Sequence, residues 1–230
     1  NILKVGYGSP FFYADGSFEV NVPSGPLEVT VERGIEYTPL TEMLDVPSSG
    51  ILKVDLKIGR WINLAQLGWY SGNTHVHYRE TETRPDDRLR LDPQVEDLKV
   101  LIISILHRWG ISYSSNKYPV GHSHDFLGEN YVTDVGEECR HNMEDWNPGY
   151  GHVLFANIKR LVEPVSRGLL VNRDDPDYPP LCDACDEAHA QGGVVIWCHD
   201  GVGMESAVAI ALGKVDALNL FDPVPSVGYD

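Results

Sequence analysis

Two short and almost continuously apolar segments constrain the fold most. Residues 98–106 read Leu-Lys-Val-Leu-Ile-Ile-Ser-Ile-Leu, and residues 194–198 read Val-Val-Ile-Trp-Cys. Strands that are buried on both faces have this composition, as in parallel sheets. Further strand candidates and helical patterns alternate with them, at residues 131–136, 152–156, 181–191, 205–212 and 215–220. The alternation predicts βα units, and hence an α/β fold with a parallel or barrel-like sheet from about residue 69 onward.

The first part of the chain, residues 1–68, has a different pattern. Apolar and polar residues alternate in segments 18–22, 27–32 and 52–58, which indicates strands with one buried face. Turn sequences such as Pro23-Ser24-Gly25-Pro26 separate these segments. We therefore expect a small antiparallel β-sandwich module over residues 1–68. The Asp92-Pro93 pair further on predicts the start of a helix.

Charge and hydropathy exclude several classes of partner. Among 230 residues, Lys and Arg number 18 and Asp and Glu 34, so the formal net charge is 18 − 34 = −16. Such an acidic surface repels nucleic-acid backbones and anionic membranes, and no apolar run is long enough to cross a bilayer. Negative potential attracts cations. We expect a small-molecule substrate, while the oligomeric state stays open.

The cysteines and the chain ends carry weaker signals. Cys182 and Cys185 form a CxxC, but no second pair follows at structural-zinc spacing. We interpret them as small residues on a helix, with a separate metal or redox site as the alternative. From both ends, at Asn1 and after Asp222-Pro223, we expect the sequence to be part of a longer protein.

Histidine and glutamate residues recur where the expected strands end. His75 and His77 stand one residue apart on an extended segment, which directs both imidazoles to the same side. Other candidates are Glu137 and Glu138 after one strand, His152 at the start of another, and His199 with Asp200 after the segment 194–198. Reactive residues of α/β folds cluster at such strand ends, and imidazole is the commonest metal ligand. The pattern predicts a metal site.

An ordered series of motifs resembles the PHP (polymerase and histidinol phosphatase) superfamily, and most closely its CehA/McbA-type metallohydrolase branch. The opening motif is Gly68-Trp69-Tyr70-Ser71-Gly72-Asn73-Thr74-His75-Val76-His77, and the later motifs are Glu96–Val100, Gly136-Glu137-Glu138, Gly151-His152-Val153, Ala188–Gly193 through His199, and Gly213–Ala217. Residues 22–31 before it resemble carboxypeptidase-regulatory-like β modules. The resemblance implies a distorted (β/α)7 barrel over residues 69–230 that binds two or three divalent ions for hydrolysis.

The resemblance also implies a ligand set: His75, His77, Glu138, His152 and His199. Glu138 is preferred over Glu137 because the family's glutamate usually stands two residues after a glycine. Many members of the wider superfamily have an Asp-His pair after the second strand. This chain departs from that pattern, because it has Glu96-Asp97 and residues 104–109 in the corresponding region. The family's last aspartate ligand would lie beyond Asp230, so we expect a barrel that is truncated at its C-terminal end. A β-sandwich leader favours an extracytoplasmic location.

The predicted chemistry is hydrolysis by a metal-activated water, without a protein nucleophile. Mixed histidine and carboxylate ligands suit Zn, Mn or Fe, and paired cations lower the pKa of water. The attacked bond would be a phosphoester, ester, amide or carbamate. Neither a Gly-x-Ser-x-Gly elbow nor a GxxxxGK[ST] loop occurs in the sequence. The alternative is a catalytically silent sugar- or protein-binding protein that keeps the same scaffold.

The other histidines and arginines have open roles. His141 follows Glu138 closely and is a candidate for a supporting residue or a proton shuttle, and residues 140–150 resemble a substrate-side loop. His122 and His124 lie in a loop that could overhang the site, although solvent exposure is the simpler interpretation. The sequence gives weaker support for a role of His107 or His189 in the site, and His189 is expected to be structural. Four arginines in one stretch could hold an anionic substrate, but the acidic residues between them favour a solvated loop. These arginines are Arg79, Arg84, Arg88 and Arg90.

Overall fold

The computed structural model of the chain describes residues 4–6, 9–78, 85–106, 118–122, 131–141, 149–166, 178–199 and 203–219. Contacts within the backbone divide it into two compact units: unit 1 is Asn1–Gly72 with Asp86–Lys99, and unit 2 is Asn73–Pro85 with Val100–Asp230. The domain boundary expected near residue 68 stays a prediction. No helix in the described ranges has the length and hydropathy needed to span a membrane.

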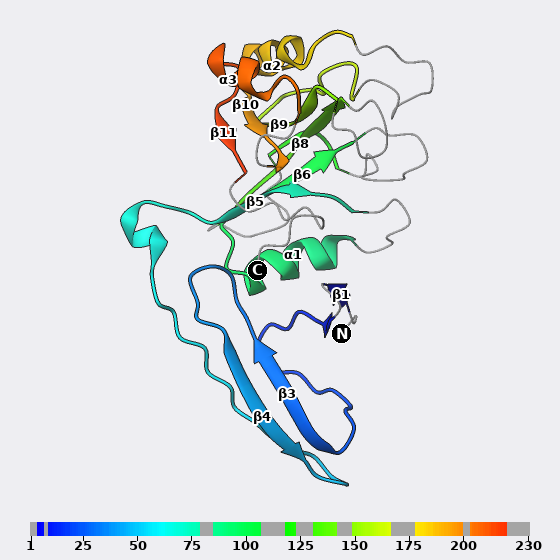
Figure 1. Cartoon of the computed structure of the whole chain (residues 1–230), viewed down its shortest axis with the longest axis vertical. Coiled ribbons are helices and arrows are strands. Elements are labelled where there is room, and N and C mark those ends of the chain that lie inside the picture. Colours follow the sequence, from blue (N-terminus) through cyan, green and yellow to red (C-terminus); the bar gives the residue numbers. More distant parts are fainter. Residues whose placement is uncertain are drawn as a thin grey trace. The chain divides into compact units, whose positions relative to one another are not determined.

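The two units differ in their secondary structure (Figure 1). Unit 1 contains β1 (Lys4–Gly6), β2 (Ser9–Phe11), β3 (Gly25–Val31), β4 (Leu40–Val46), the 3-10 helix η1 (Leu64–Leu67) and nearly all of α1 (Pro85–Val95). Unit 2 contains nearly all of β5 (Gly72–Val76), then β6 (Val100–Ile105), β7 (Gly121–His122), β8 (Val132–His141), β9 (Gly151–Ala156), α2 (Leu181–Ala190), β10 (Val194–Trp197), α3 (Ser206–Ala211) and β11 (Ala217–Leu218).

Unit 2 is built on a curled, mixed half-barrel sheet of seven strands. The strand order is β11-β10-β9-β8-β6-β5, with β7 beside β8. The α/β class is therefore confirmed, and the sheet, which was expected to be parallel or barrel-like, is curled and mixed in strand direction. β6 and β8 are parallel, as are β10 and β11, whereas β9 is antiparallel to both of its neighbours, β8 and β10. Residues 142–150, which join β8 to β9, are too few for a crossover helix, so β9 returns beside β8 in the opposite direction.

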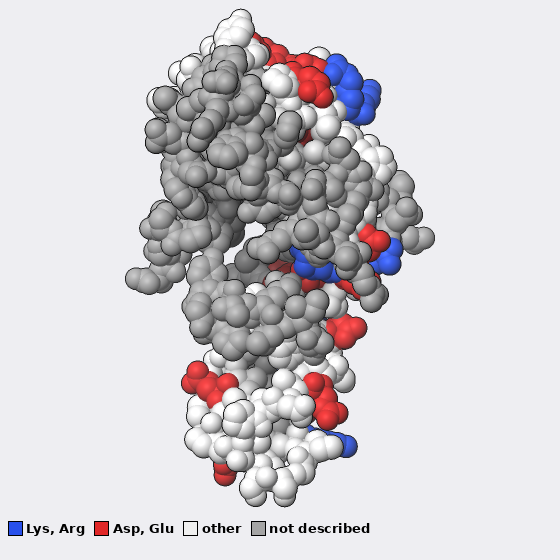
Figure 2. All heavy atoms as spheres, turned by 90° about the vertical axis from the view of Figure 1, so that its right-hand side faces the viewer, with Lys and Arg blue, Asp and Glu red and all other residues white. Residues whose placement is uncertain are grey.

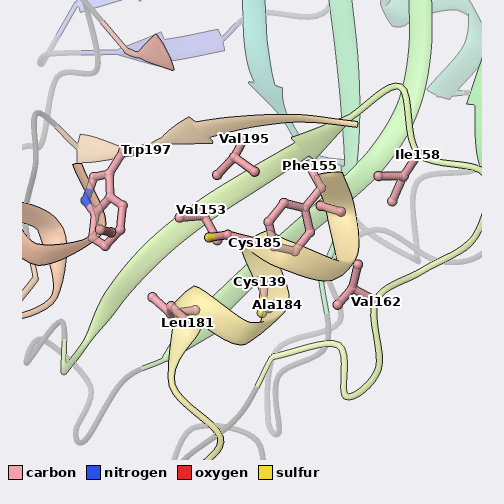
Figure 3. Packing of buried hydrophobic residues seen from close by; sticks show 12 residues of the cluster. Cys139, Val153, Phe155, Ile158, Val162, Leu181, Ala184, Cys185, Val195 and Trp197 are labelled. Atoms are coloured by element: carbon pink, nitrogen blue, oxygen red, sulfur yellow. The ribbon is translucent and has the colours of Figure 1, made fainter. Parts of the chain in front are cut away.

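The core of unit 2 lies between the sheet and helix α2. Figure 3 shows Val153 and Phe155 of β9, Val195 of β10 and Cys185 of α2 in one cluster of buried side chains. Trp197 is the largest fully buried side chain among the described residues. In α2 the buried residues recur at helical spacing: Leu181, Ala184, Cys185 and Ala188. The helix predicted at 181–191 and the strands predicted at 152–156 and 194–198 are therefore confirmed, each within a residue or two.

Unit 1 contains small two-stranded antiparallel sheets, β1–β2 and β3–β4. The β3 strand confirms the expectation for residues 27–32, but no strand forms over 18–22 or 52–58. Side chains of both segments stay exposed, for example Val20 at 50% and Val54 at 45%. Alternating apolar and polar residues provide one apolar face, but a strand also needs a neighbouring strand with which its backbone can form hydrogen bonds. These segments have no such neighbour among the described residues.

The helix start expected at Asp92-Pro93 is also wrong. Helix α1 begins at Pro85 and contains Pro93 near its C-terminal end. Pro85 supplies the fixed φ that suits a first helical position, and Asp86 and Asp87 in the first turn complement the helix dipole. Asp97, at φ 56, then turns the chain away from the helix.

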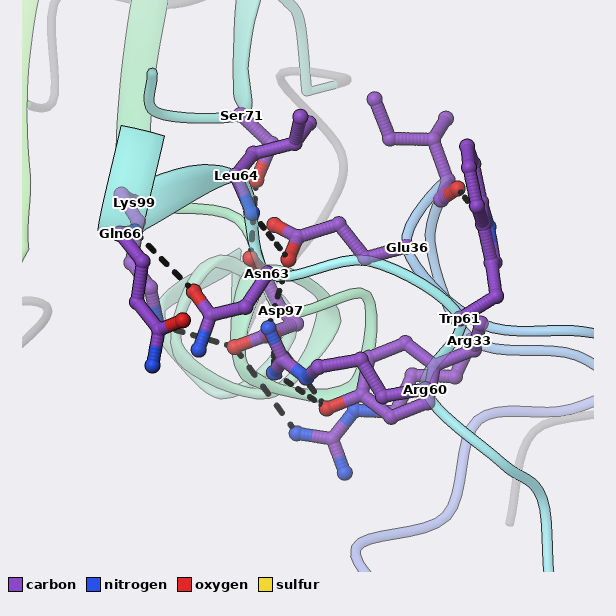
Figure 4. A network of polar contacts seen from close by, with 12 residues as sticks. Arg33, Glu36, Arg60, Trp61, Asn63, Leu64, Gln66, Ser71, Asp97 and Lys99 are labelled. Atoms are coloured by element: carbon purple, nitrogen blue, oxygen red, sulfur yellow. Dashed lines mark hydrogen bonds and ion pairs between the residues drawn. The ribbon is translucent and has the colours of Figure 1, made fainter. Parts of the chain in front are cut away.

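A polar network around Asp97 joins three segments of unit 1 (Figure 4). The Asp97 carboxylate accepts from Lys99 Nζ at 2.9 Å and pairs with the Arg60 guanidinium. Arg60 also donates to Glu36 Oε2 at 2.6 Å, and the same oxygen accepts from the backbone N–H of Leu64 at 3.0 Å. Burial would raise the pKa of Asp97, but the hydrogen bonds and charges of Lys99 and Arg60 outweigh it and lower that pKa.

Replacing Asp97 by Asn should therefore destabilise the protein in a pH-dependent way. At pH 7 we expect a loss of about 2 kcal/mol in the free energy of unfolding, because charge-assisted hydrogen bonds are lost. The folded-state pKa lies below the ordinary value of about 3.9, so the stabilisation is present above that pH and disappears as pH falls through the folded-state pKa. Urea unfolding of D97N and wild type across this pH range measures the difference. The exposed Asp55, replaced by Asn as a control, should change stability by less than about 0.5 kcal/mol.

Gly136 marks a close approach between β8 and β9. A Cβ atom at this position would lie 2.0 Å from the Phe155 carbonyl oxygen, which belongs to the rigid backbone of the next strand. We predict that Gly136→Ala lowers the free energy of unfolding by about 1–3 kcal/mol or prevents folding. Gly59 has open space around it, so Gly59→Ala is the matched control and should be nearly neutral in the same unfolding assay. Equal stability of the two variants would contradict the close approach.

Candidate metal centre

Neighbouring strands of the unit 2 sheet bring the predicted ligand residues together. His75 lies in β5, His77 follows its last residue, Glu138 lies in β8, and His152 lies in β9. His199 stands just beyond β10, with its backbone at φ 55, in the left-handed region. Among the described residues, two groups could hold a metal ion: His75, His77 and Glu138 form one, and Glu138, His152 and His199 form the other. In each group the ligand atoms all lie within 4.8 Å of one another, and Glu138 belongs to both.

In the first group both imidazoles point at one carboxylate oxygen. His77 Nε2 lies 2.6 Å from Glu138 Oε2, and His75 Nε2 lies 3.1 Å from the same atom. The two rings meet edge to face, with centroids 5.0 Å apart. The side chains of His75 and His77 are 14% and 19% exposed, while that of Glu138 is only 1% exposed. A nearly buried carboxylate thus faces a pair of partly accessible imidazoles.

A backbone carbonyl group determines the protonation of the two ring nitrogens of His77. His77 Nδ1 lies 2.9 Å from the Ser104 carbonyl oxygen, which can only accept, so Nδ1 carries a proton. Nε2 then either carries a second proton or directs a lone pair at the negative Glu138 oxygen. Two facing lone pairs repel, so a positive charge must lie between these atoms. A proton or a bound cation meets this requirement, and the carbonyl contact is the kind that orients a metal-ligating histidine.

An arginine contacts the second group. Arg140 Nε lies 3.3 Å from His152 Nε2 and 3.1 Å from Glu138 Oε1. The single Nε–H is directed at His152, so the approach to Oε1 is an ion pair rather than a hydrogen bond. The ring of His199 lies 5.0 Å from that of His152 and 5.2 Å from that of His75, measured between centroids. The ring of His199 therefore lies close to a member of each group.

Burial and charge act on the ionisation of this cluster. Burial would raise the pKa of Glu138, but hydrogen bonds from His75 and His77 and the charge of Arg140 hold that pKa well below its usual range. Burial, and then the charge of Arg140, lowers the pKa of His152 far below its ordinary value. At neutral pH the cluster thus contains an ionised carboxylate and, at His152, a neutral imidazole. These are the protonation states that metal ligation requires.

The donor set fits a divalent cation. Zinc binds imidazole nitrogen at about 2.0–2.1 Å and carboxylate oxygen at about 2.0–2.2 Å, so tetrahedral ligand atoms lie about 3.3 Å apart. The 3.1 Å from His75 to Glu138 is close to this spacing, and the 2.6 Å from His77 is somewhat shorter. Glu138 Oε1 is buried and accepts no hydrogen bond from any residue that the structure describes, and the Arg140 guanidinium at 3.1 Å supplies the positive charge that compensates it.

The neighbours of Glu138 on β8 have other contacts. Glu137 accepts from the backbone N–H of Val162 at 2.6 Å, so the structure directs Glu138 and not Glu137 toward the histidines. His141 accepts from the Tyr150 N–H at 3.2 Å and stacks on the Tyr150 ring at 4.0 Å. Strand alternation places His141 on the same face as Glu137 and opposite Glu138. A supporting or shuttling role for His141 stays a prediction.

The remaining candidates lie away from the cluster or outside the described residues. His122 contacts Asn157 Oδ1 at 3.1 Å, and His189 on α2 contacts Asp216 Oδ2 at 2.9 Å. Cys185 is buried in the core and Cys182 is partly buried beside it; burial raises the pKa of both thiols, and neither metal-capable group among the described residues includes a cysteine. Several candidates fall outside the described residues: Arg79, Arg84, His107, His124, Asp200 and positions 142–148 of the expected substrate-side loop.

Two residues with close contacts to the cluster were not among the predicted ligands. The sequence predicts Arg140 only as the start of a loop, and Ser104 only as part of the segment that departs from the family's ligand pattern. The spacing Glu138-x-Arg140 within a strand is a usable signal, because side chains two residues apart share a face. The Ser104 contact uses a backbone carbonyl, which the identity of the residue does not reveal.

Comparison of the chain with protein-family models, with curated proteins and with solved structures gave no significant match. The function therefore has to be argued from the geometry of the cluster.

Removing both histidines of the first group should abolish metal binding there. We predict that wild-type protein dialysed against Zn²⁺ retains the metal, and that the double variant H75A/H77A does not, because it loses both nitrogen donors to Glu138 Oε2. Elemental analysis of the dialysed proteins measures this. The control is His189→Ala, which removes a histidine that lies on α2 and pairs with Asp216, and should leave the metal content unchanged. Equal zinc content in H75A/H77A and wild type would contradict the assignment.

Proposed function

We propose that the protein is a PHP-like metal-dependent hydrolase that cleaves a phosphoester, ester, amide or carbamate bond of a small molecule. One observation carries the proposal: donors from β5, β8, β9 and the end of β10 converge in two groups that share a buried glutamate. Under this proposal the curled sheet is part of a distorted (β/α)7 barrel. Residues 1–68 are then a separate β module of the carboxypeptidase-regulatory kind.

The protein's own residues prepare the site for a cation. The Ser104 carbonyl fixes the proton of His77 on Nδ1 and so directs Nε2 into the cluster. Glu138 supplies a negative charge that stays ionised because its pKa is held low. When a divalent ion is bound, it acts as a Lewis acid and supplies a nucleophile by lowering the pKa of a water. This chemistry needs no serine or cysteine nucleophile.

The charge of the molecule supports a small substrate rather than a nucleic acid. The chain carries a formal net charge of −16. On the face shown in Figure 2, the described acidic and basic side chains occur in small groups, several of them mixed. Polyanions bind to continuous basic surfaces, whereas a metal site can bind a single anionic or carbonyl group.

Hydrolysis should depend on divalent ions and on the Glu138 carboxylate. We expect a chelator to abolish turnover of phosphoesters, esters, amides or carbamates in a substrate panel, and added Zn²⁺ or Mn²⁺ to restore it. Glu138→Gln should reduce turnover at least about 100-fold, since changes to residues that only support ligands already cost about 10- to 100-fold in metal affinity or activity. Glu137→Gln is the matched control, because that side chain bonds the Val162 backbone instead.

Hydrolysis that survives complete removal of divalent ions would refute the proposed mechanism. A protein that binds metal stoichiometrically but turns over no member of the panel would instead be a binding protein on the same scaffold.

A further inference from the structure

We propose that Arg140 restricts the centre to one tightly bound cation by occupying the second group with its guanidinium. This inference rests on the proposed metal centre and specifies how many cations it binds. The first group, His75, His77 and Glu138, would bind the cation. The second group, Glu138, His152 and His199, would be held closed to a further cation.

Strand geometry fixes Arg140 over the second group. Arg140 of β8 stands directly opposite His152 of β9 in the antiparallel register, and two residues from Glu138 on the same face of β8. The Ser166 hydroxyl contacts the Arg140 backbone N–H and the Glu138 carbonyl oxygen, both at 3.4 Å. The Arg140 side chain is only 17% exposed. The guanidinium is therefore part of the site and not a solvent-facing group that passes near it.

Arg140 uses the atoms that a second cation would need. Its Nε–H donates to His152 Nε2, so the lone pair on that nitrogen is already engaged. Its positive charge lies against Glu138 Oε1 at 3.1 Å. The other carboxylate oxygen, Oε2, faces His75 and His77. The two oxygens of Glu138 are thus divided between the two groups, and the contacts of Arg140 are on the side of the second group.

The guanidinium of Arg140 places a positive charge in the second group. A cation entering the second group would have to displace a fixed positive charge and break the contact to His152. In this way Arg140 supplies the second positive charge itself, and the site operates with one metal ion and one guanidinium.

The stoichiometry of zinc binding tests the proposal. Wild type, Arg140→Gln, Arg140→Lys and the control Arg160→Gln would be dialysed against buffered Zn²⁺ and measured by elemental analysis and calorimetric titration. Arg160 is a suitable control because it pairs with Glu187 and its side chain is 64% exposed. Circular dichroism would verify that each variant is folded.

We expect one zinc per chain for wild type, R140K and R160Q, and two for R140Q. The second zinc of R140Q should be lost again in R140Q/H152A, because His152 supplies its ligand. Equal stoichiometry in wild type and R140Q, whether one or two, would overturn the role of Arg140 and leave the metal centre standing. Failure of wild type and of R140Q to bind any zinc would contradict the metal centre itself.

Discussion

The negative charge of Glu138, buried in the middle of a sheet, is the constraint on which the site depends. Its side chain is 1% exposed, and an isolated carboxylate in that position would be strongly disfavoured. The Arg140 guanidinium compensates this charge at Oε1, and the proposed cation would compensate it at Oε2, between the carboxylate and the imidazoles of His75 and His77. The geometry of the site follows from the need to bring these groups to one point, and so does the low pKa of the carboxyl group.

The sheet meets this need by placing β8 between other strands. β6 and β9 flank β8, β5 lies beyond β6, and β10 lies beyond β9, so each donor comes from a strand close to Glu138. The same strand presents Cys139 to the core that α2 covers, which anchors β8 from its other face. Gly136 lets the backbones of β8 and β9 approach closely just before Glu138. Packing on one face of β8 thus holds the charged groups on the other.

Much of unit 2 could be predicted because its signals are local. Continuous apolar runs marked β6 and β10, and helical spacing of small buried residues marked α2. The histidines of the cluster could be found because they stand at or near strand ends, and neighbouring strands then bring them together. Glu138, which was expected after a strand, lies inside β8, because that strand continues to His141. The direction of β9 was not predicted, because it depends on the length of the connection from β8 and not on the composition of the strand. Arg140 was missed because its role appears only when β8 and β9 are in register.

The failures in unit 1 have a related cause. Residues 52–58 alternate as a strand should, but alternation describes one face and does not supply a partner strand. Asp92-Pro93 has the composition of a helix start, but Pro85 lies earlier and opens the helix first. The Asp97 network joins residues far apart in the sequence, through side chains whose partners no local pattern indicates.

Anomalous diffraction from crystals grown with Zn²⁺ tests the central claim most directly, because it locates the cation independently of any activity. We predict a peak about 2.0–2.2 Å from His75 Nε2, His77 Nε2 and Glu138 Oε2. A fully loaded crystal with no peak at these atoms, or with its zinc bound at the cysteines or on the surface instead, would contradict it.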